Sequence, residues 1–450
     1  MNVWNATAYC MDGYLTESKC RSNAVLKIEA ENGLSDKAKL LNSFSQFLAL
    51  ALCLFVSVYS SASATSVAFV GAKIYPGPDL PSIESGVIVV VDGIITAIGP
   101  VGHVEMPNAV KTINVIGKTI TAGLWNSHVH FNVPPLDTLS QEDLTAYVRD
   151  MLLSRGFLYV LDTGSMPGTT AEIRRRIESG EIAGPRILVA GGSLVPAGAS
   201  PFYLRPNVLP DAALPEHAQA QIDMAIQMGA DAIKIYSGSI VGLSERGPDV
   251  VPMDVAVVKG IADAAHARDL FVIAHPSNNS GAWAAVRGGV DILAHTFPQE
   301  GWDRTLPSEM VDRGVALIPT LKLWRYEGER FELPEDSISN SIRIAQEQVF
   351  AVSLLGGEIL FGTDVGYMSD FDPTAEYRLM QEAGLSFEQI LASLTTAPAK
   401  RFGMAARVGR LTPGRDADLV ILPLDPVDDI TSFAKPETVV QRGEVVFRHD

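Results

Sequence analysis

The sequence predicts an α/β protein: a (β/α)8 TIM barrel with a small composite β-sandwich domain built from the N- and C-terminal segments. Three observations predict this fold. Short apolar runs alternate with helical patterns through residues 123–400, strand-like stretches occupy residues 65–122 and 401–450, and 47% of the 450 residues are hydrophobic, enough for a large core. A doubly wound open sheet with fewer strands is the alternative for the central part.

Residues 1–64 differ from the rest of the chain. Lys37 and Lys39 precede the apolar run "FLALALCLFVSV", and Ala62 and Ala64 form an A-x-A site. This pattern is typical of a secretory signal peptide cleaved after Ala64, and it predicts a periplasmic or secreted protein. An uncleaved anchor is the alternative, although the run is shorter than the roughly 20 residues that span a bilayer. A start codon further downstream would explain the long stretch before the signal.

The N-terminal β segment, residues 65–122, contains short apolar stretches separated by turn residues. In "SGVIVVVDGIITAIG", Val91-Asp92-Gly93 lies between two apolar runs, which is typical of a hairpin. We expect antiparallel strands in this segment.

Eight apolar runs are predicted as the barrel strands: "TAGLWNSHVH", "FLYVLDTG", "PRILVAGG", "DAIKIYSG", "LFVIAHP", "VDILAHT", "VALIPTL" and "EILFGTD". The segments between them, such as "SQEDLTAYVRDMLLSRG" and "MDVAVVKGIADAAHARD", have apolar residues at helical spacing. Strand–helix units repeated in this way predict a closed barrel, whose active site lies at the C-terminal ends of the strands.

The C-terminal segment, residues 401–450, contains "ADLVILPLD" and "ETVVQRGEVVF", the second with a hairpin through Arg442-Gly443. Together with residues 65–122 it would form one sandwich-like domain, with the barrel inserted between the two parts.

Composition excludes some classes of partner. The formal net charge of −17 repels phosphate backbones and anionic lipid, so we expect no nucleic-acid binding and no stable membrane insertion after signal cleavage. A small-molecule substrate is expected instead, and a homo-oligomer is an open possibility. All three cysteines, Cys10, Cys20 and Cys53, precede the proposed cut, so the mature chain would have no disulfide and no thiol ligand.

Metal-binding side chains recur at the C-terminal ends of the predicted strands. In "GLWNSHVHF" two histidines are one residue apart, so in a strand both side chains point to the same face. The full set of candidate ligands comes from five strands: His128, His130, Lys234, His275, His295 and Asp364. In a closed barrel they would converge at one mouth, and histidine nitrogens with a carboxylate oxygen are usual ligands of Zn²⁺ or a similar ion. A hydrogen-bonded core histidine is the alternative for each one taken singly.

Lys234 lies in "ADAIKIYSG", where strand alternation puts Ile233 and Ile235 on one face and the lysine on the other. With the isoleucines under the helices, the lysine points into the barrel. There it could act as a base with a lowered pKa, or react with CO₂ to give a carbamate that binds two metals. An ion pair with Asp162 or Asp364 is the alternative.

Asp364 ends the last predicted strand. A carboxylate at this place can ligate a metal and accept a proton from water activated by the ion. Gly362 and Gly366 would let the backbone approach the site closely. A structural aspartate that caps the next helix is the alternative.

Several motifs together resemble the amidohydrolase superfamily, particularly its imidazolonepropionase-like and prolidase-like branches: "GLWNSHVHF", "DAIKIYSG", "VIAHP", "DILAHT", "FGTDVG", "SLTTAPAKRFG" and "GRLTPGRDADLVIL". The resemblance covers nearly all of the mature chain. It implies two divalent ions, with Zn²⁺ as the expected metal, held as follows: one by His128, His130 and Asp364, the other by His275 and His295, and both by carboxylated Lys234. Imidazolonepropionase lacks the bridging lysine, so Lys234 favours the two-metal arrangement.

The resemblance also implies hydrolysis. A hydroxide that bridges the metals would attack a carbonyl carbon, and Asp364 would accept the proton and donate it to the leaving group. We therefore expect an exported amide-bond hydrolase whose small substrate is an N-acyl amino acid, a dipeptide or a cyclic amide. A lactonase or a ring aminohydrolase is the alternative among enzymes. An inactive barrel used as a binding or assembly scaffold is the alternative from another class, and the complete ligand set argues against it.

Four residues near other strand ends are candidate substrate contacts: Tyr236, Lys322, Tyr203 and Arg205. Tyr236 follows the buried lysine, and "SPFYLRP" supplies two of the others. Arginine binds a carboxylate as a fork and lysine as a point charge. Surface ion pairs and simple packing are the alternatives.

Overall fold

The computed structural model describes residues 66–108, 110–132, 136–201, 209–212, 215–238 and 251–449. The expected signal peptide, its cleavage site near Ala64 and the three cysteines lie outside these ranges. Among the helices in the described ranges, none is both long enough and apolar enough to cross a membrane.

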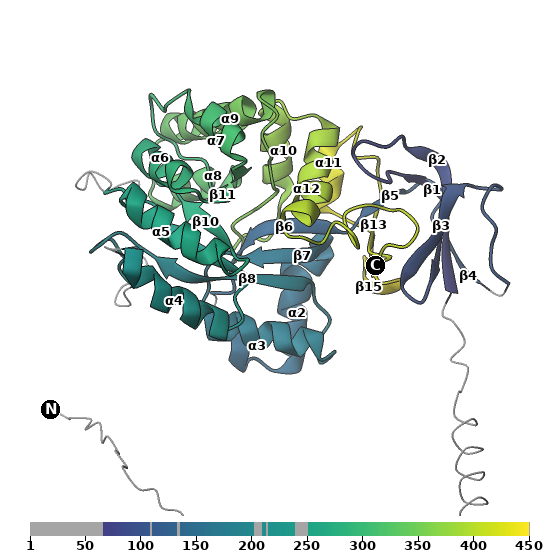
Figure 1. Cartoon of the computed structure of the whole chain (residues 1–450). Coiled ribbons are helices and arrows are strands. Elements are labelled where there is room, and N and C mark those ends of the chain that lie inside the picture. The colour runs from purple at the N-terminus through teal and green to yellow at the C-terminus, as the bar shows by residue number, and fades with distance from the viewer. Residues whose placement is uncertain are drawn as a thin grey trace, which may run out of the picture. The chain divides into compact units, whose positions relative to one another are not determined.

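Seven parallel strands form the central sheet, and each strand lies beside the next one in the chain (Figure 1). They are β6 (Leu124–Val129), β7 (Phe157–Asp162), β8 (Arg186–Leu194), β9 (Ala232–Tyr236), β10 (Phe271–His275), β11 (Ile292–Ala294) and β12 (Ala316–Ile318). Neighbours in chain order are what repeated βα units produce.

The eighth predicted strand, residues 358–364, closes the barrel without forming a regular ladder. An isolated parallel bridge joins Ile359 to Leu317 in the middle of β12, and another joins Val365 to Val129 at the end of β6. Asp364 has a φ of 60°, so the segment leaves the extended conformation near its end. The predicted (β/α)8 barrel is confirmed, with an irregular last strand.

The helices lie outside the barrel strands (Figure 1). They are α2 (Gln141–Met151), α3 (Pro167–Glu178), α4 (Pro215–Gln227), α5 (Val255–His266), α6 (Asn279–Gly288), α7 (Leu306–Arg313), α8 (Lys322–Arg330), α9 (Glu335–Leu354), α10 (Thr374–Glu382), α11 (Phe387–Leu394) and α12 (Thr396–Arg401). The core under these helices contains Ile233 and Ile235, whereas Ala232 belongs to the cluster of residues inside the barrel. The predicted orientation of β9, with its isoleucines under the helices, is confirmed.

The composite domain is one mixed sheet that contains strands from both ends of the chain. Its strands are β1 (Ser66–Ile74), β2 (Ile83–Val91), β3 (Ile94–Pro100), β4 (Lys111–Asn114), β5 (Thr119–Ala122), β13 (Leu419–Leu422), β14 (Thr438–Gln441) and β15 (Glu444–Arg448). The antiparallel pairing of β5 with β13, which places Ala122 opposite Leu419, joins the two terminal segments. Ala68 and Phe69 belong to different apolar clusters, so both faces of β1 are packed.

The expectation of antiparallel strands alone in residues 65–122 is wrong at β1. This strand pairs in parallel with β4 along its first half and with β5 along its second half. The segment between β3 and β4 carries the chain back across the sheet, so the returning strands run in the same direction as β1. The change of partner occurs at Gly71, which has a φ of 98°.

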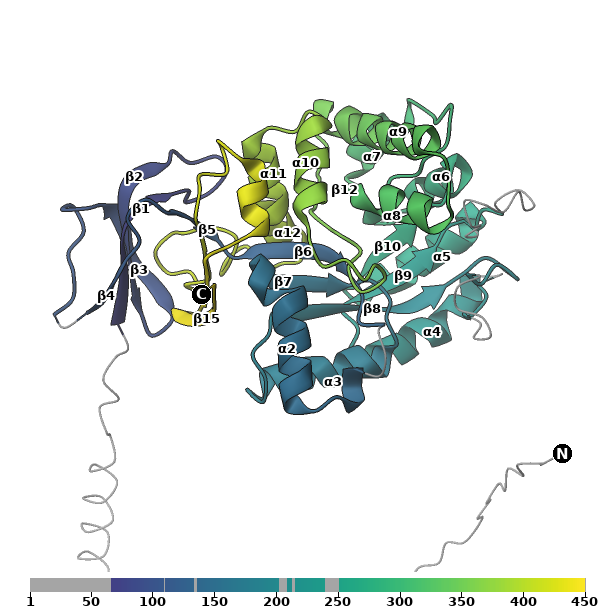
Figure 2. The ribbon, with the colours of Figure 1, turned by 180° about the vertical axis from the view of Figure 1, so that it is seen from behind.

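Asp418 joins the composite domain to the bottom of the barrel. Its carboxylate accepts a hydrogen bond from the Tyr159 hydroxyl of β7 and one from the Arg442 backbone N–H at 2.6 Å. Its carbonyl accepts from the N–H of Gly123, just before β6, at 2.8 Å. Helices α11 and α12 lie beside β6, the first strand of the barrel, in both ribbon views (Figure 2).

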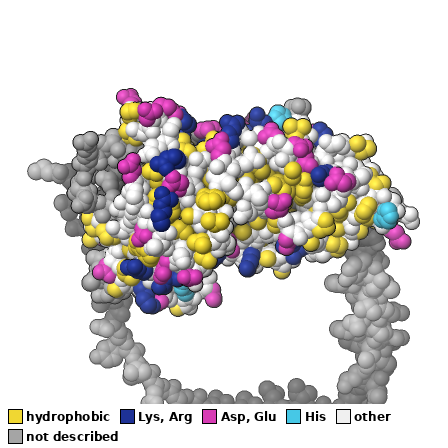
Figure 3. Space-filling view, turned by 90° about the horizontal axis from the view of Figure 1, so that it is seen from above, with side chains coloured by type: hydrophobic (Ala, Val, Ile, Leu, Met, Phe, Trp, Pro, Cys, Tyr) yellow, Lys and Arg dark blue, Asp and Glu magenta, His cyan; other side chains and the backbone are white. Residues whose placement is uncertain are grey.

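The face shown in Figure 3 carries acidic and basic side chains interspersed with apolar ones, without a continuous basic patch. Exposed apolar side chains include Phe350 and Leu354 near the C-terminal end of α9. The expectation of a homo-oligomer stays a prediction.

Candidate active site

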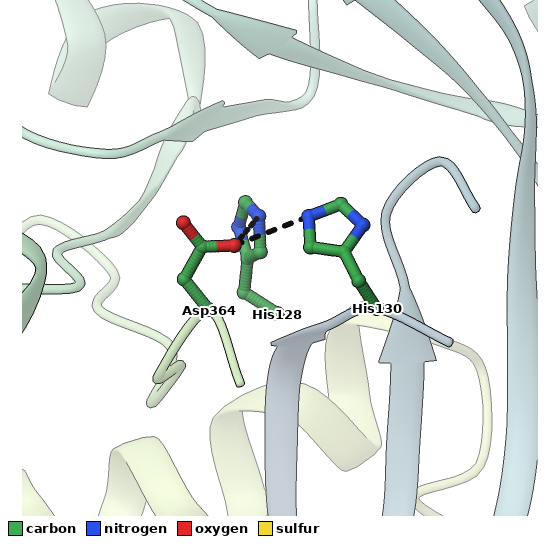
Figure 4. A group of neighbouring side chains, drawn as sticks. All are labelled: His128, His130 and Asp364. Atoms are coloured by element: carbon green, nitrogen blue, oxygen red, sulfur yellow. Dashed lines mark ion pairs between the residues drawn. The ribbon is translucent and has the colours of Figure 1, made fainter. Parts of the chain in front are cut away.

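Three predicted ligands meet where the barrel closes. His128 and His130, at the end of β6, point toward Asp364 of the last strand (Figure 4). Nε2 of His128 lies 3.3 Å from Oδ1 of Asp364, and Nε2 of His130 lies 3.1 Å from the same oxygen. One ligand atom from each residue lies within 4.8 Å of the other two, and all three residues are buried. The structure thus brings together residues from the first and the last of the predicted barrel strands.

Several polar atoms of this group are buried without a hydrogen-bond partner among the described residues. They are both ring nitrogens of His128, Nδ1 of His130 and Oδ1 of Asp364. Buried polar atoms are normally satisfied, because leaving them unpaired costs free energy. Two imidazoles and a carboxylate are a donor set that Zn²⁺ and similar ions accept. The residues therefore fit a divalent ion.

Burial and neighbouring charges set the protonation of His128 and Asp364. Burial lowers the pKa of His128 to about 4, although the charge of Asp364 opposes the shift. Burial by itself would raise the pKa of Asp364, but its contacts with His128 and His130 outweigh that effect and hold the pKa well below its ordinary value. Neutral imidazole and ionised carboxylate are the forms that bind metals.

The second predicted pair of histidines adjoins the first. His275 ends β10 and His295 follows β11, and their ring centres are 4.6 Å apart. The ring of His295 is also 4.4 Å from the ring of His128. Burial lowers the pKa of His275 and of His295 well below the ordinary value. All four predicted histidines therefore form one continuous cluster.

Thr320 is a site residue that the sequence reasoning missed. Its Oγ1 lies 2.6 Å from Nδ1 of His295 and donates to the carbonyl of Pro319 at 2.9 Å. A hydroxyl has a single proton, so Nδ1 of His295 is the donor of the shorter bond, and Nε2 keeps its lone pair for a ligand. The available signal was its place at the end of the seventh predicted strand, "VALIPTL".

Lys234 points into the barrel beside the histidines. It is 1% exposed, and burial lowers its pKa to about 8. Within the described part of the chain it forms no ion pair, so the alternative of a salt bridge to Asp162 or Asp364 is not found. Oδ1 of Asp162 instead accepts from the N–H and the hydroxyl of Ser165, at 3.0 and 2.7 Å. Gly164 lies beside the lysine stem and has a φ of 125°, and a Cβ there would lie 2.8 Å from Oγ of Ser193.

The glycines on either side of Asp364 are required for close packing, as predicted. A Cβ on Gly366 would lie 1.7 Å from the carbonyl oxygen of His130. A Cβ on Gly362 would lie 2.8 Å from Cβ of His128. Side chains at these positions would push the last strand away from β6.

The candidate substrate contacts have different surroundings. Tyr236 is buried beside the site, with its ring centre 5.4 Å from that of His275. Nζ of Lys322 donates to the carbonyls of Asp370 and Asp372 at 3.1 and 2.7 Å, so its ammonium is already hydrogen-bonded to the loop that contains these two residues. Tyr203 and Arg205 lie outside the described residues. Their roles, and those of Tyr236 and Lys322, stay predictions.

A polar group that the sequence reasoning missed lies near Asp364. The Tyr367 hydroxyl donates to Oε1 of Glu327 at 2.9 Å and accepts from Arg330 at 2.7 Å. Burial raises the pKa of Glu327, and the charge of Asp364 adds to that shift. No sequence motif distinguished these residues, since they meet only when α8 packs against the segment that follows the last strand.

Glu376 gives a prediction about stability and pH. It is fully buried in α10 and accepts from the backbone N–H groups of Leu321 and Lys322, at 2.9 and 2.8 Å. Burial raises its pKa from 4.5 to about 7, although these N–H groups oppose the shift. The folded state therefore binds a proton more tightly than the unfolded state. The stability contribution is fully present below pH 4.5 and is lost as the pH rises through 7, an effect of about 3 kcal/mol.

The measurement is the free energy of unfolding in urea for the wild type and for Glu376→Gln, which is neutral at every pH. The wild type should lose about 3 kcal/mol relative to the variant between pH 4.5 and 8. Parallel pH profiles for the two proteins would show that the carboxyl of Glu376 does not titrate in this range.

Comparisons with known proteins identify the family and similar folds. The model of the amidohydrolase family matches residues 119–446. An ochratoxinase from Aspergillus niger is 24% identical, over 83% of this chain and 85% of its own length. Among solved structures, a Xaa-Pro dipeptidase with bound methionine superimposes with a TM-score of 0.74 at 21% identity, covering 85% of this chain and all of its own. A prolidase complexed with N-methylphosphonate-L-proline has a TM-score of 0.71 at 25% identity, covering 86% of this chain and all of its own.

Proposed function

Because the chain belongs to the amidohydrolase family, we propose that it is an exported binuclear-metal hydrolase that cleaves an amide C–N bond in a small substrate. The observation that carries the proposal is the buried group of His128, His130 and Asp364, in which several polar atoms lack hydrogen-bond partners among the described residues. The adjoining histidines and the buried lysine complete the donor set. Export is supported by the sequence of residues 37–64 alone.

Six residues would hold the metals in this proposal: His128, His130 and Asp364 one ion, His275 and His295 the other, and Lys234 both. When bound, divalent ions polarise a carbonyl and make water acidic enough to act as a nucleophile near neutral pH. Thr320 fixes the tautomer of His295, which leaves Nε2 directed away from Thr320.

Asp364 moves the proton during hydrolysis. Its carboxylate is ionised and lies between two histidines at the barrel mouth, where it can accept a proton from the attacking water. The water oxygen bonds to the carbonyl carbon and the C–N bond breaks. The proton held by Asp364 passes to the leaving nitrogen, so the products are a carboxylic acid and an amine.

Lys234 would act as a carbamate. Its Nζ bonds to the carbon of CO₂ and releases one proton, which leaves an anionic group with two oxygens for two ions. Burial supports this proposal, because a bare ammonium inside a barrel is costly and Lys234 has no ion-pair partner in the described ranges. The competing roles for Lys234 are that of a general base and that of a ligand to one ion only.

The substrate class is supported by the relatives. The Xaa-Pro dipeptidase is named for dipeptides, and the prolidase structure contains a phosphonate of proline. We therefore propose dipeptides, N-acyl amino acids and cyclic amides as substrates, with Tyr236 as the nearest described candidate for contacting them.

A hydrolysis screen tests this function. The chain from Thr65 onward, reconstituted with Zn²⁺, is incubated with N-acyl amino acids, dipeptides that end in proline, cyclic amides and lactones. We expect turnover of at least one amide class that requires the added metal. Turnover of lactones alone would overturn the amide assignment, and metal-independent turnover would overturn the metal centre as its cause.

A further inference from the structure

The seam between β6 and the last strand is irregular next to the site. The Ser127 N–H donates to the carbonyl of Phe361 at 2.7 Å, and the Asp364 N–H donates to the carbonyl of His128 at 2.9 Å. In a regular parallel pair the residue that donates to Phe361 would also accept from Thr363, but here the acceptor is the next residue of β6 and the donor is Asp364. The N–H of Thr363 is bonded to a side chain instead.

The side chain of Asn126 supplies the missing hydrogen-bond partner at this irregular step. Its Oδ1 accepts from the N–H of Thr363 at 3.1 Å and from the N–H of His128 at 3.3 Å. Its Nδ2 donates to Oγ1 of Thr363 at 2.7 Å. Two of the partners are N–H donors, so the orientation of the amide is fixed by its hydrogen bonds. Asn126 is fully buried and shares the inward face of β6 with His128 and His130, two and four residues later.

These bonds act on both sides of Asp364. Thr363 precedes it, and the hydroxyl of Thr363 accepts from the N–H of Val365, which follows it, at 3.3 Å. The φ of 60° at Asp364 is sparsely populated by non-glycine residues, and such a conformation persists only when its surroundings fix it. The same amide oxygen holds the backbone of His128, the residue that faces Asp364 across the seam.

We propose that Asn126 is a positioning residue: through Thr363 and the N–H of His128, it holds Asp364 and His128 in the mutual geometry that the metal centre needs. The inference rests on the proposed function for the role of those two residues. A structural role alone would stabilise the barrel without affecting the ligands, and the experiment must separate the two.

The experiment compares four variants. Asn126→Leu keeps the size of the side chain and removes every hydrogen bond. Asn126→Asp keeps the acceptor and lets the Thr363 hydroxyl donate to it. Thr363→Val removes that hydroxyl, and it replaces Asn126→Leu as the test variant if Asn126→Leu fails to fold. Tyr159→Phe, at the opposite end of the barrel, is the matched control, because it also removes one buried hydrogen bond to a side chain.

Each protein is loaded with Co²⁺, and its visible absorption, metal affinity, kcat and KM are measured. Asn126→Leu should change the Co²⁺ spectrum and weaken metal affinity about 10- to 100-fold. Its kcat should fall about 100-fold with KM nearly unchanged, since a small misplacement of reacting groups has that effect. Thr363→Val should show a smaller shift in the same direction. Asn126→Asp should recover the wild-type spectrum, and Tyr159→Phe should lose stability only.

Hydrogen exchange distinguishes failure of this inference from failure of the proposed function. If the wild type takes up no metal, the proposed function is overturned, and exchange in peptides that cover residues 124–130 and 358–368 still tests the positioning. Faster exchange there in Asn126→Leu, recovered in Asn126→Asp, supports it. Unchanged exchange, or a wild-type Co²⁺ spectrum in Asn126→Leu, would overturn it.

Discussion

Asp364→Asn should lower kcat for amide hydrolysis by about 1,000-fold, because an amide cannot accept the proton from the attacking water. The fold should be retained. Asparagine tolerates a left-handed backbone as well as aspartate does, and residue 364 has a φ of 60°. The measurement is kcat at equal metal content per chain, with unfolding followed in parallel, so that loss of metal and loss of proton transfer are separated.

Asp269→Asn is the matched control for this change. Asp269 also has a left-handed φ, of 58°, but it is exposed and lies between α5 and β10, before the strand rather than after it. The control should retain wild-type kcat. A metal-loaded Asp364→Asn protein with kcat within about threefold of wild type would contradict the role of Asp364 as proton acceptor.

Lys234→Ala should lose most of its bound metal and nearly all activity, because the substitution removes the donor proposed to contact both ions. The vacated space should bind formate or acetate, whose two oxygens take the place of the carbamate oxygens. Metal content and kcat should therefore recover in part when these acids are added at millimolar concentration or above. Metal analysis after desalting, with and without acetate, measures the effect.

The rescue also separates the roles that lysine can play at this place. Recovery with methylamine rather than acetate would indicate an amine acting as a base. Undiminished metal content in Lys234→Ala would show that no carbamate links the two ions. Lys259→Ala is the control, since its side chain is exposed and pairs with Asp263 one helical turn away on α5.

Local patterns were sufficient for much of the fold. The alternation in "ADAIKIYSG" predicts which side of β9 faces the helices, because strand periodicity is a property of a few neighbouring residues. The two histidines of "GLWNSHVHF" could be assigned to one face for the same reason. The pairing of the terminal β segments followed from their strand-like composition at both ends of a barrel pattern.

Other features depend on contacts that the local sequence does not specify. Asn126 and Thr363 are separated by 237 residues, and the irregular seam that brings them together exists only after the barrel closes. The hydrogen bond between His295 and Thr320 likewise forms only because the neighbouring strands β11 and β12 end at the same level. The parallel pairs of β1 depend on how the connection from β3 to β4 crosses the sheet, which its composition does not indicate. The signal peptide, the metal identity and the substrate contacts stay predictions.

Metal content is the most direct test of the central claim that the barrel mouth holds a binuclear metal centre. The chain from Thr65 onward, purified and then dialysed against Zn²⁺ and bicarbonate, is analysed by inductively coupled plasma mass spectrometry. We predict about two ions per chain, as a two-metal site requires, falling sharply when His128 is replaced by alanine. A well-folded protein that stays metal-free under these conditions would contradict the account.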